Sequence, residues 1–161
     1  MPTRKSLRAV FNTSPLIVLT KLGVLREALS LFSEVEIPYG VLKEIEKGDD
    51  EVHQELARLI TEKKIYVEDI RRKLPRLGLG ESSAIFLALV KKKIVVLDDK
   101  KARKLARELG LEVVGTLAIL KKLYEKSVLK ESPITLYKHL VDIGFYISKK
   151  LFDKIFQGNT S

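Results

Sequence analysis

Ile94-Val95-Val96-Leu97-Asp98-Asp99 is the stretch that best indicates the fold of this chain. Its first four residues form a continuous apolar run rich in β-branched side chains, which is typical of a parallel strand buried on both faces. The run ends at two carboxylates. An amphipathic helix pattern follows, which Gly110 ends, and its apolar stripe consists of Ala102, Leu105, Ala106 and Leu109. A buried strand that leads directly into a helix predicts an α/β fold.

The same alternation of apolar segments and helix patterns continues along the chain. Further strands are predicted at Leu7–Phe11, Val35–Ile37, Ile65–Val67 and Val113–Val114. A first helix is predicted to continue to Val24, with Ser14 as its cap and Pro15 at its first position. Another helix is predicted to follow the capping residues Asp49 and Asp50. The remaining helices are predicted over Pro38–Lys47, Glu81–Val90, Thr116–Lys126, Ile134–Asp142 and Lys149–Phe156. This order predicts a central parallel sheet of about five strands with helices on both faces. We expect one domain over residues 1–161, with a core at about 7–130 and a C-terminal helical extension at about 131–157.

Composition excludes several classes of protein. The 161 residues contain no Cys, which excludes disulfide scaffolds, Fe–S clusters, thiolate zinc sites and cysteine nucleophiles. No apolar run is long enough to span a membrane and no secretory signal is visible, so we expect a cytoplasmic protein.

The net charge of +9 (30 Lys and Arg against 21 Asp and Glu) has two explanations. It favours a polyanionic partner, because clustered cations attract nucleic acid. It also fits a thermophile, because Asn and Gln are rare beside abundant Lys, Glu and Arg.

Candidate site residues follow from the sheet. Ligand sites of parallel sheets lie at the carboxyl ends of the strands, where this chain has Asn12 and the pair Asp98-Asp99. Glu81 shares a helix face with Ala84, Ile85 and Ala88, so its carboxylate is expected to be partly buried and to need a cation, a partner or a proton. Two plainer interpretations stay open: Glu81 complements the helix dipole, and one Asp caps the next helix.

Carboxylates on separate segments, without Cys or a His cluster, predict a hard divalent cation, Mg²⁺ or Mn²⁺. His53 and His139 each lie alone among charged neighbours and are interpreted as surface residues. Ser82 and Ser83 have no G-x-S-x-G context, and Gly78-Leu79-Gly80 has Ser83 in place of a third nucleotide-binding glycine. A carboxylate-held cation in a basic protein therefore predicts phosphate-ester chemistry.

Several segments, which follow one another in a fixed order along the chain, carry a family resemblance: Phe11 to Ile17, Ile37 to Glu44, Gly78 to Ile85, Val96 to Arg103, Val114 to Leu117 and Gly144 to Ser148. Together they resemble the PIN-domain family, in particular its VapC-like prokaryotic branch and a subgroup of it that starts with Asn-Thr-Ser-Pro-Leu-Ile. The similarity extends from about Val10 to Phe156. It implies a Mg²⁺- or Mn²⁺-dependent endoribonuclease that hydrolyses RNA, often the toxin of a toxin–antitoxin pair with an antitoxin protein as partner, and usually a homodimer.

The resemblance also implies the site residues. The family's acidic positions fall on Asn12, Glu44, Glu81 and Asp99, and Asp98 stands where many relatives have a hydroxyl residue. We therefore expect the metal ligands Glu81, Asp99, Asp98 and Asn12, with Glu44 as a further catalytic residue. Glu44 rests on the resemblance alone, and Glu46 is the alternative. The residues expected to bind RNA are basic: Lys100, Lys101, Arg103, Arg71, Arg72 and Arg76.

Asn12 departs from the family pattern, in which an Asp usually follows the first strand. An amide oxygen still ligates a hard cation, but one negative charge is missing and affinity for Mg²⁺ is expected to fall. The alternative function is therefore a weak or catalytically silent module that binds RNA or a protein. The apolar C-terminal segment, from Phe145 to Phe156, is expected either to pack into the core or to form a partner surface. Positive charge is expected to concentrate around Asp98-Asp99.

Overall fold

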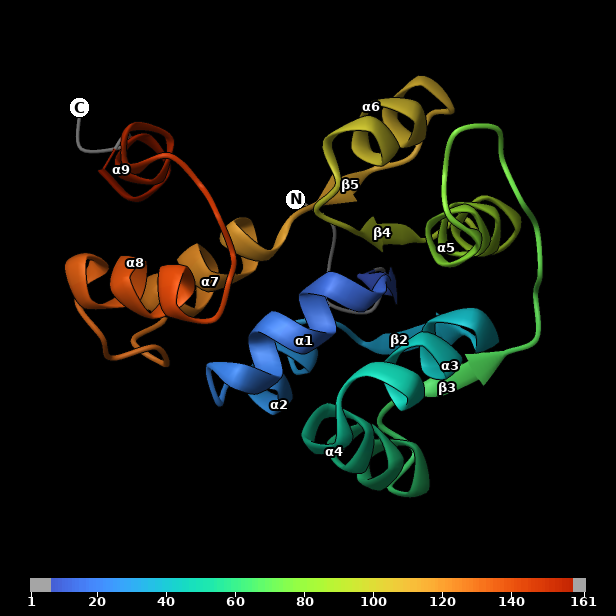
Figure 1. Cartoon of the computed structure of the whole chain (residues 1–161), viewed down its shortest axis with the longest axis horizontal. Coiled ribbons are helices and arrows are strands. Elements are labelled where there is room, and N and C mark those ends of the chain that lie inside the picture. Colours follow the sequence, from blue (N-terminus) through green and yellow to red (C-terminus); the bar gives the residue numbers. More distant parts are fainter. Residues whose placement is uncertain (1–6, 158–161) are drawn as a thin grey trace.

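Five parallel strands form one sheet in the centre of the molecule (Figure 1). The computed structural model describes residues 7–157, so both ends of the expected domain lie outside the described residues. The strands are β1 (Arg8–Phe11), β2 (Glu34–Pro38), β3 (Tyr66–Glu68), β4 (Ile94–Val96) and β5 (Val113–Val114), and their order in the sheet is β3-β2-β1-β4-β5. The prediction of an α/β fold with about five parallel strands is confirmed.

Helices cover both faces of this sheet. They are α1 (Thr13–Lys21), α2 (Leu25–Leu29), α3 (Tyr39–Gly48), α4 (Asp50–Thr61), α5 (Leu79–Lys91), α6 (Lys100–Glu108), α7 (Thr116–Glu125), α8 (Pro133–Asp142) and α9 (Lys149–Gln157). Figure 1 shows α5 and α6 on one side of the sheet and α1, α2 and α7 on the other. No helix within residues 7–157 is both long and apolar enough to cross a lipid bilayer.

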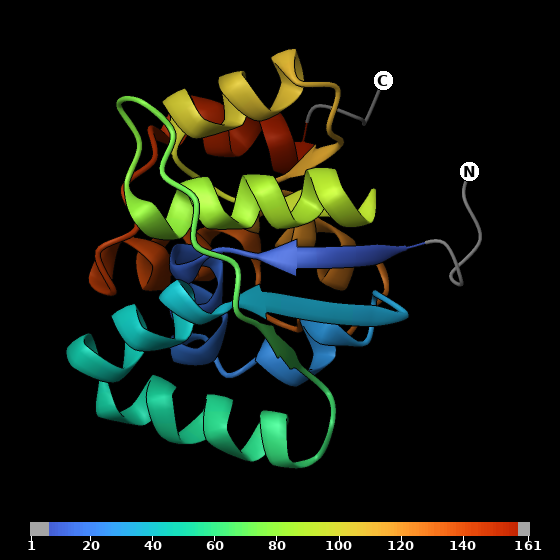
Figure 2. The ribbon, with the colours of Figure 1, turned by 90° about the vertical axis from the view of Figure 1, so that its right-hand side faces the viewer.

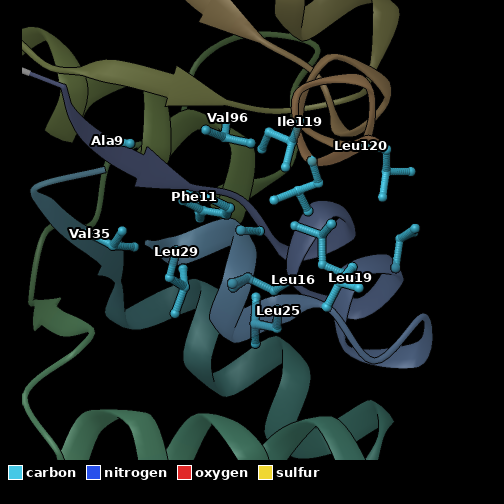
Figure 3. Packing of buried hydrophobic residues seen from close by; sticks show 14 of the residues in the cluster. Ala9, Phe11, Leu16, Leu19, Leu25, Leu29, Val35, Val96, Ile119 and Leu120 are labelled. Carbon is cyan, nitrogen blue, oxygen red and sulfur yellow. The ribbon is translucent and has the colours of Figure 1, made fainter. Parts of the chain in front are cut away.

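Strand β4 shows why the apolar run at Ile94 decides the fold. Val95 and Leu97 pack with α5 and α6, whereas Ile94 and Val96 belong to the larger core on the opposite face. Successive side chains of a strand point to opposite faces, so only an uninterrupted apolar run serves a strand that is covered on both sides. Figure 3 shows the larger core, where Val96 lies near Phe11 and Ile119.

The start of the first helix differs from the expectation. α1 begins at Thr13 with Asn12 as its N-cap residue, and the Asn12 side chain makes no capping hydrogen bond. Ser14 and Pro15 therefore lie inside the first turn, where a proline is tolerated because first-turn N–H groups lack helical partners. The Ser14 hydroxyl, not used as a cap, donates to Asp98 Oδ2 at 3.2 Å.

The helix expected to continue to Val24 is divided in two. α1 ends at Lys21, and Gly23 adopts a left-handed conformation with φ of +74°, which glycine does without steric cost. α2 then starts at Leu25. The apolar pattern crosses this break because both helices face the same core.

The C-terminal aromatic residues divide between core and surface. Phe152 of α9 is fully buried and stacks on Phe156 with ring centroids 4.5 Å apart. Tyr146, by contrast, is 83% exposed. Core packing thus accounts for Phe152.

A buried ion cluster ties α5 to the sheet. The Lys93 side chain, 1% exposed, contacts the carboxylates of Glu34 and Glu36, and the Glu36 side chain is 3% exposed. Lys91 adds ion pairs to Glu36 at 3.3 Å and to Glu68 at 3.1 Å. Buried charges are stable only when paired, so this cluster requires all of its members.

Candidate active site

The expected site residues gather at the carboxyl ends of β1, β2 and β4. β1 and β2 point in the same direction in Figure 2. The Asn12 N–H donates to the Val96 carbonyl at 2.9 Å, which joins the ends of β1 and β4. Glu44 lies on α3, which follows β2, and Glu81 lies in the first turn of α5. Strand order therefore brings together residues separated by many positions in the chain.

Asn12 and Glu44 meet beside Gly80. A β-carbon built on Gly80 would lie 3.0 Å from Glu44 Oε2 and 3.7 Å from Asn12 Oδ1. Glycine at this position thus leaves room for both oxygens. Asn12 Oδ1 is buried and has no hydrogen-bond partner among the described residues. An unpaired buried acceptor is costly, so this oxygen is suited to a cation or another donor that the protein itself does not supply.

The surroundings of Glu81 disfavour the charged form of its carboxylate. Partial burial, then the nearby charges of Asp99 and Glu44, raise the pKa of Glu81 above its ordinary value of 4.5. A hydrogen bond from the Gly78 N–H to Glu81 Oε1, at 3.4 Å, acts in the opposite direction and is outweighed. Glu81 therefore lies in the first turn of α5, where the interpretation as a complement to the helix dipole places it. Its carboxylate also interacts with the charges of two other acids.

Asp98 and Asp99 cap two different helices. Asp99 Oδ2 accepts from the Ala102 N–H at 2.9 Å and caps α6. Asp98 Oδ1 accepts from the Thr116 N–H at 2.8 Å and Oδ2 from the Thr116 hydroxyl at 2.6 Å, at the start of α7, where the N-cap residue Gly115 has no side chain. Each of the two adjacent aspartates thus accepts hydrogen bonds from the start of a different helix. Both Asp98 oxygens therefore accept hydrogen bonds that position the end of β4, and metal ligation by Asp98 stays a prediction.

The donor set fits a hard cation. Glu44, Glu81 and Asp99 form no ion pair with any Lys, Arg or His of residues 7–157, although the chain contains 30 Lys and Arg. No three acidic or histidine side chains within that range approach closely enough to form a ready-made metal cluster. The fourth donor is the amide oxygen of Asn12. Oxygen donors of this kind suit Mg²⁺ or Mn²⁺.

A pocket of about 420 Å³ opens at this place, and the C-terminal segment borders it. Asn12, Glu44 and Glu81 line it, and so do Phe145 and its neighbours after α8. Phe145 was expected in the core or in a partner surface and not at the site. The Gly144-Phe145-Tyr146 segment was the available signal: Gly144 adopts a left-handed φ of +86° just after α8, and both Gly144 and Phe145 line the pocket.

The expected RNA-binding residues differ in their surroundings. Lys100 and Lys101 are exposed beside Asp99 at the start of α6. Arg103 instead donates to the Leu97 carbonyl at 3.1 Å, and burial and Arg107 lower its pKa. Its guanidinium supports the end of β4, and the residue is half-buried. The remaining three are exposed in the segment between β3 and α5: Arg71, Arg72 and Arg76.

Positive charge is not confined to the neighbourhood of Asp98-Asp99. Exposed lysines also lie on the C-terminal helix α9, for example Lys150 and Lys154. The two histidines pair with acids on the surface, His53 with Glu46 at 4.0 Å and His139 with Glu131 at 2.9 Å. Part of the basic excess is therefore a general property of the surface.

Comparisons with known proteins identify the fold and the family of the chain. A solved PilT N-terminus domain protein from the hyperthermophilic archaeon Sulfolobus solfataricus P2 is similar to the chain with a TM-score of 0.51 and 19% identity, over 78% of this chain and 96% of that one, which shows a shared fold. No curated protein gives a significant match. A family model described as a PIN domain (DUF3368) matches residues 8–160. PIN domains are typically nucleases and generally use divalent metal ions. The chain therefore belongs to the PIN-domain family.

Proposed function

We propose that this protein is an endoribonuclease that depends on Mg²⁺ or Mn²⁺, held by four residues: Asn12, Glu44, Glu81 and Asp99. One observation carries the proposal. Within residues 7–157, Glu44, Glu81 and Asp99 have no ion-pair partner, and the charges of Asp99 and Glu44 act on Glu81. The buried amide oxygen of Asn12, which has no hydrogen-bond partner among the described residues, lies with Glu44 beside Gly80. A basic protein that leaves acids unpaired at this position has a place for a cation.

The chain's own residues prepare this site. Gly80 lets Glu44 and Asn12 approach each other, and Asp98 holds the end of β4 against α1 and α7 through Ser14 and Thr116. A divalent cation bound there would polarise a phosphoryl oxygen and lower the pKa of the attacking water. Exposed cations near the site, among them Lys100 and Lys101, would attract the polyanion without reading its sequence. We also retain the antitoxin partner and the homodimer as predictions from the family.

The direct test compares two glutamates of α3 on labelled single-stranded RNA with Mn²⁺, Mg²⁺ or EDTA. We expect Glu44→Gln to lower the cleavage rate by at least about tenfold, because the variant removes a charge that supports the cation. Glu46→Gln is the matched control, since Glu46 is exposed and pairs with Lys43 at 3.4 Å. Equal rates for both variants, or full activity in EDTA, would contradict the proposal.

Asn12→Asp tests whether the missing charge weakens the site. Without divalent ions we expect Asn12→Asp to destabilise the fold, because a fourth carboxylate joins a partly buried acidic group. With Mn²⁺ we expect tighter binding, on the order of tenfold in the midpoint of a thermal-shift titration, and faster RNA cleavage. If the variant neither binds Mn²⁺ more tightly nor cleaves, while the protein still binds RNA, the silent-module alternative is correct.

A further inference from the structure

A second pocket, of about 440 Å³, lies directly beside the candidate active site. Glu44 and Gly80 line both pockets and form the wall between them. The second pocket is also lined by three cations and two large side chains with apolar surface: Tyr39, Lys43, Lys47, Arg71 and Leu79. We call it the Tyr39 pocket. Its volume lies in the roughly 300–1,000 Å³ range of ligand sites.

Helix α3 connects the two pockets. Tyr39, Lys43 and Lys47 follow one another at four-residue intervals and so form one stripe of the helix. Glu44 occupies the next position along from Lys43, and its carboxylate reaches Gly80 and the candidate active site. A chain molecule bound along this side of α3 would therefore contact both pockets at once.

The Tyr39 pocket offers a surface suited to a nucleobase. Arg71 Cζ lies 5.0 Å and Lys43 Nζ 5.6 Å from the centre of the Tyr39 ring, and these cation–π contacts hold the ring in place. Leu79 is 47% exposed although it is large and apolar. Rings and guanidinium groups held in this way are the surfaces on which proteins stack unpaired bases.

The cations of the pocket are available to a ligand. Lys47 has no ion-pair or hydrogen-bond partner within residues 7–157. Arg71 pairs with Asp69 at 2.8 Å, but both side chains are more than 60% exposed. Exposed pairs contribute little to stability, so they exchange readily for a phosphate.

We propose that the Tyr39 pocket binds one nucleotide of single-stranded RNA, next to the phosphodiester bond held at the candidate active site; this inference rests on the proposed function. The base would pack on Tyr39 and Leu79, and its phosphate would contact Lys47 and Arg71. The strand must be single, because bases in a duplex stay stacked on each other and cannot enter a pocket. The shared wall of Glu44 and Gly80 favours nucleic acid over an acidic peptide, because it joins the pocket to the proposed cleavage site.

The test measures binding separately from cleavage. The probe is a fluorescent 2′-O-methyl oligouridylate in EDTA, which cannot be cut. We expect Leu79→Ala and Tyr39→Ala each to weaken binding roughly tenfold. Lys47→Ala should reduce the salt dependence of binding by about 0.7 in the log–log slope, the share of one phosphate on a single strand. With cleavable RNA and Mn²⁺, the same variants should raise KM and leave kcat nearly unchanged.

Matched control variants distinguish effects of the Tyr39 pocket from general effects of changing an exposed side chain. Val90→Ala changes a 68% exposed apolar residue at the other end of α5, and Lys150→Ala changes an exposed lysine of α9; neither should alter binding. Equal effects of Leu79→Ala and Val90→Ala, or equal binding of duplex RNA or polyglutamate, would overturn the inference. If the pocket variants lose binding in EDTA but no protein cleaves RNA, the proposed nuclease function fails and the nucleotide pocket stands. If cleavage depends on Glu44 but not on Tyr39, Lys47 or Leu79, the pocket inference alone fails.

Discussion

Glu81→Gln is expected to lose RNA cleavage and to gain stability. The cleavage rate should fall at least about 100-fold, because loss of a metal ligand costs no less than loss of the residues that merely support ligands. Without divalent ions, the free energy of unfolding at neutral pH should rise by about 0.5–1 kcal/mol, as is common when a strained functional group is removed. The physical reason is that Glu81 is partly buried and repelled by Asp99 and Glu44, and a neutral amide avoids both costs.

The pH dependence of stability provides an independent check on Glu81. Its folded-state pKa is raised above its ordinary value of 4.5, so between the two pKa values the native state binds more protons than the unfolded state. The free energy of unfolding should therefore decrease as the pH rises from 4.5 through the folded pKa. Glu81→Gln should remove this part of the pH dependence.

Urea unfolding in EDTA across this pH range, together with cleavage assays in Mn²⁺, measures both effects. Glu51→Gln is the matched control, because Glu51 also lies in the first turn of a helix but is exposed and does not line the candidate active-site pocket. Asp99→Asn should lose cleavage while its remaining side-chain oxygen still caps α6. A Glu81→Gln protein that cuts RNA as fast as the Glu51→Gln control would remove Glu81 from the site.

Lys93→Met is expected to lower the free energy of unfolding by about 3 kcal/mol, the lower end of the cost of breaking a buried ion pair. Within residues 7–157, the substitution leaves the buried carboxylate of Glu36 with the partly exposed Lys91 as its remaining cationic partner. Methionine fills a similar volume, so the loss reports the unpaired charge and not a cavity. Urea denaturation at neutral pH measures it.

Two further variants test whether the unpaired charge causes the loss of stability in Lys93→Met. Lys92→Met changes the neighbouring exposed lysine and should have almost no effect on the unfolding free energy. The double variant Lys93→Met with Glu36→Met should recover most of the lost stability, since replacing both charges removes the desolvation cost. If the double variant is as unstable as Lys93→Met alone, the buried charge is not the cause.

Some features of the candidate site were visible in the sequence, because they follow from local pattern. The apolar run before Asp98 marks a buried strand, and the carboxyl ends of parallel strands are where sites lie. Glu81 could be singled out because its helix face is apolar. Asp99 could be singled out by its place after a buried strand, whereas Glu44 rested on the family resemblance alone, because nothing in its own helix pattern distinguishes it from Glu46.

Other features were missed because local pattern gives no information about distant partners. An aspartate that caps the helix after it and one that caps a helix elsewhere look the same in sequence, so the separate duties of Asp98 and Asp99 could not be distinguished. Glu36 in the middle of an apolar strand gave no hint of Lys93 as its partner. Phe145 belongs to an apolar segment and to a segment of the family resemblance, and neither pattern indicated that it lines the candidate site.

The sequence by itself determined the α/β class, the parallel strands and the end of the sheet at which to look, because hydrophobic periodicity and helix-ending residues act within a few positions of the chain. The tertiary structure decided which acids share the site. It did so through the strand order, which places β4 beside β1 and so brings the residues after Val96 next to Asn12. It also placed the Tyr39 stripe of α3 beside Leu79 of α5. Contacts of this kind depend on how helices and strands pack, and packing joins residues that no local pattern connects.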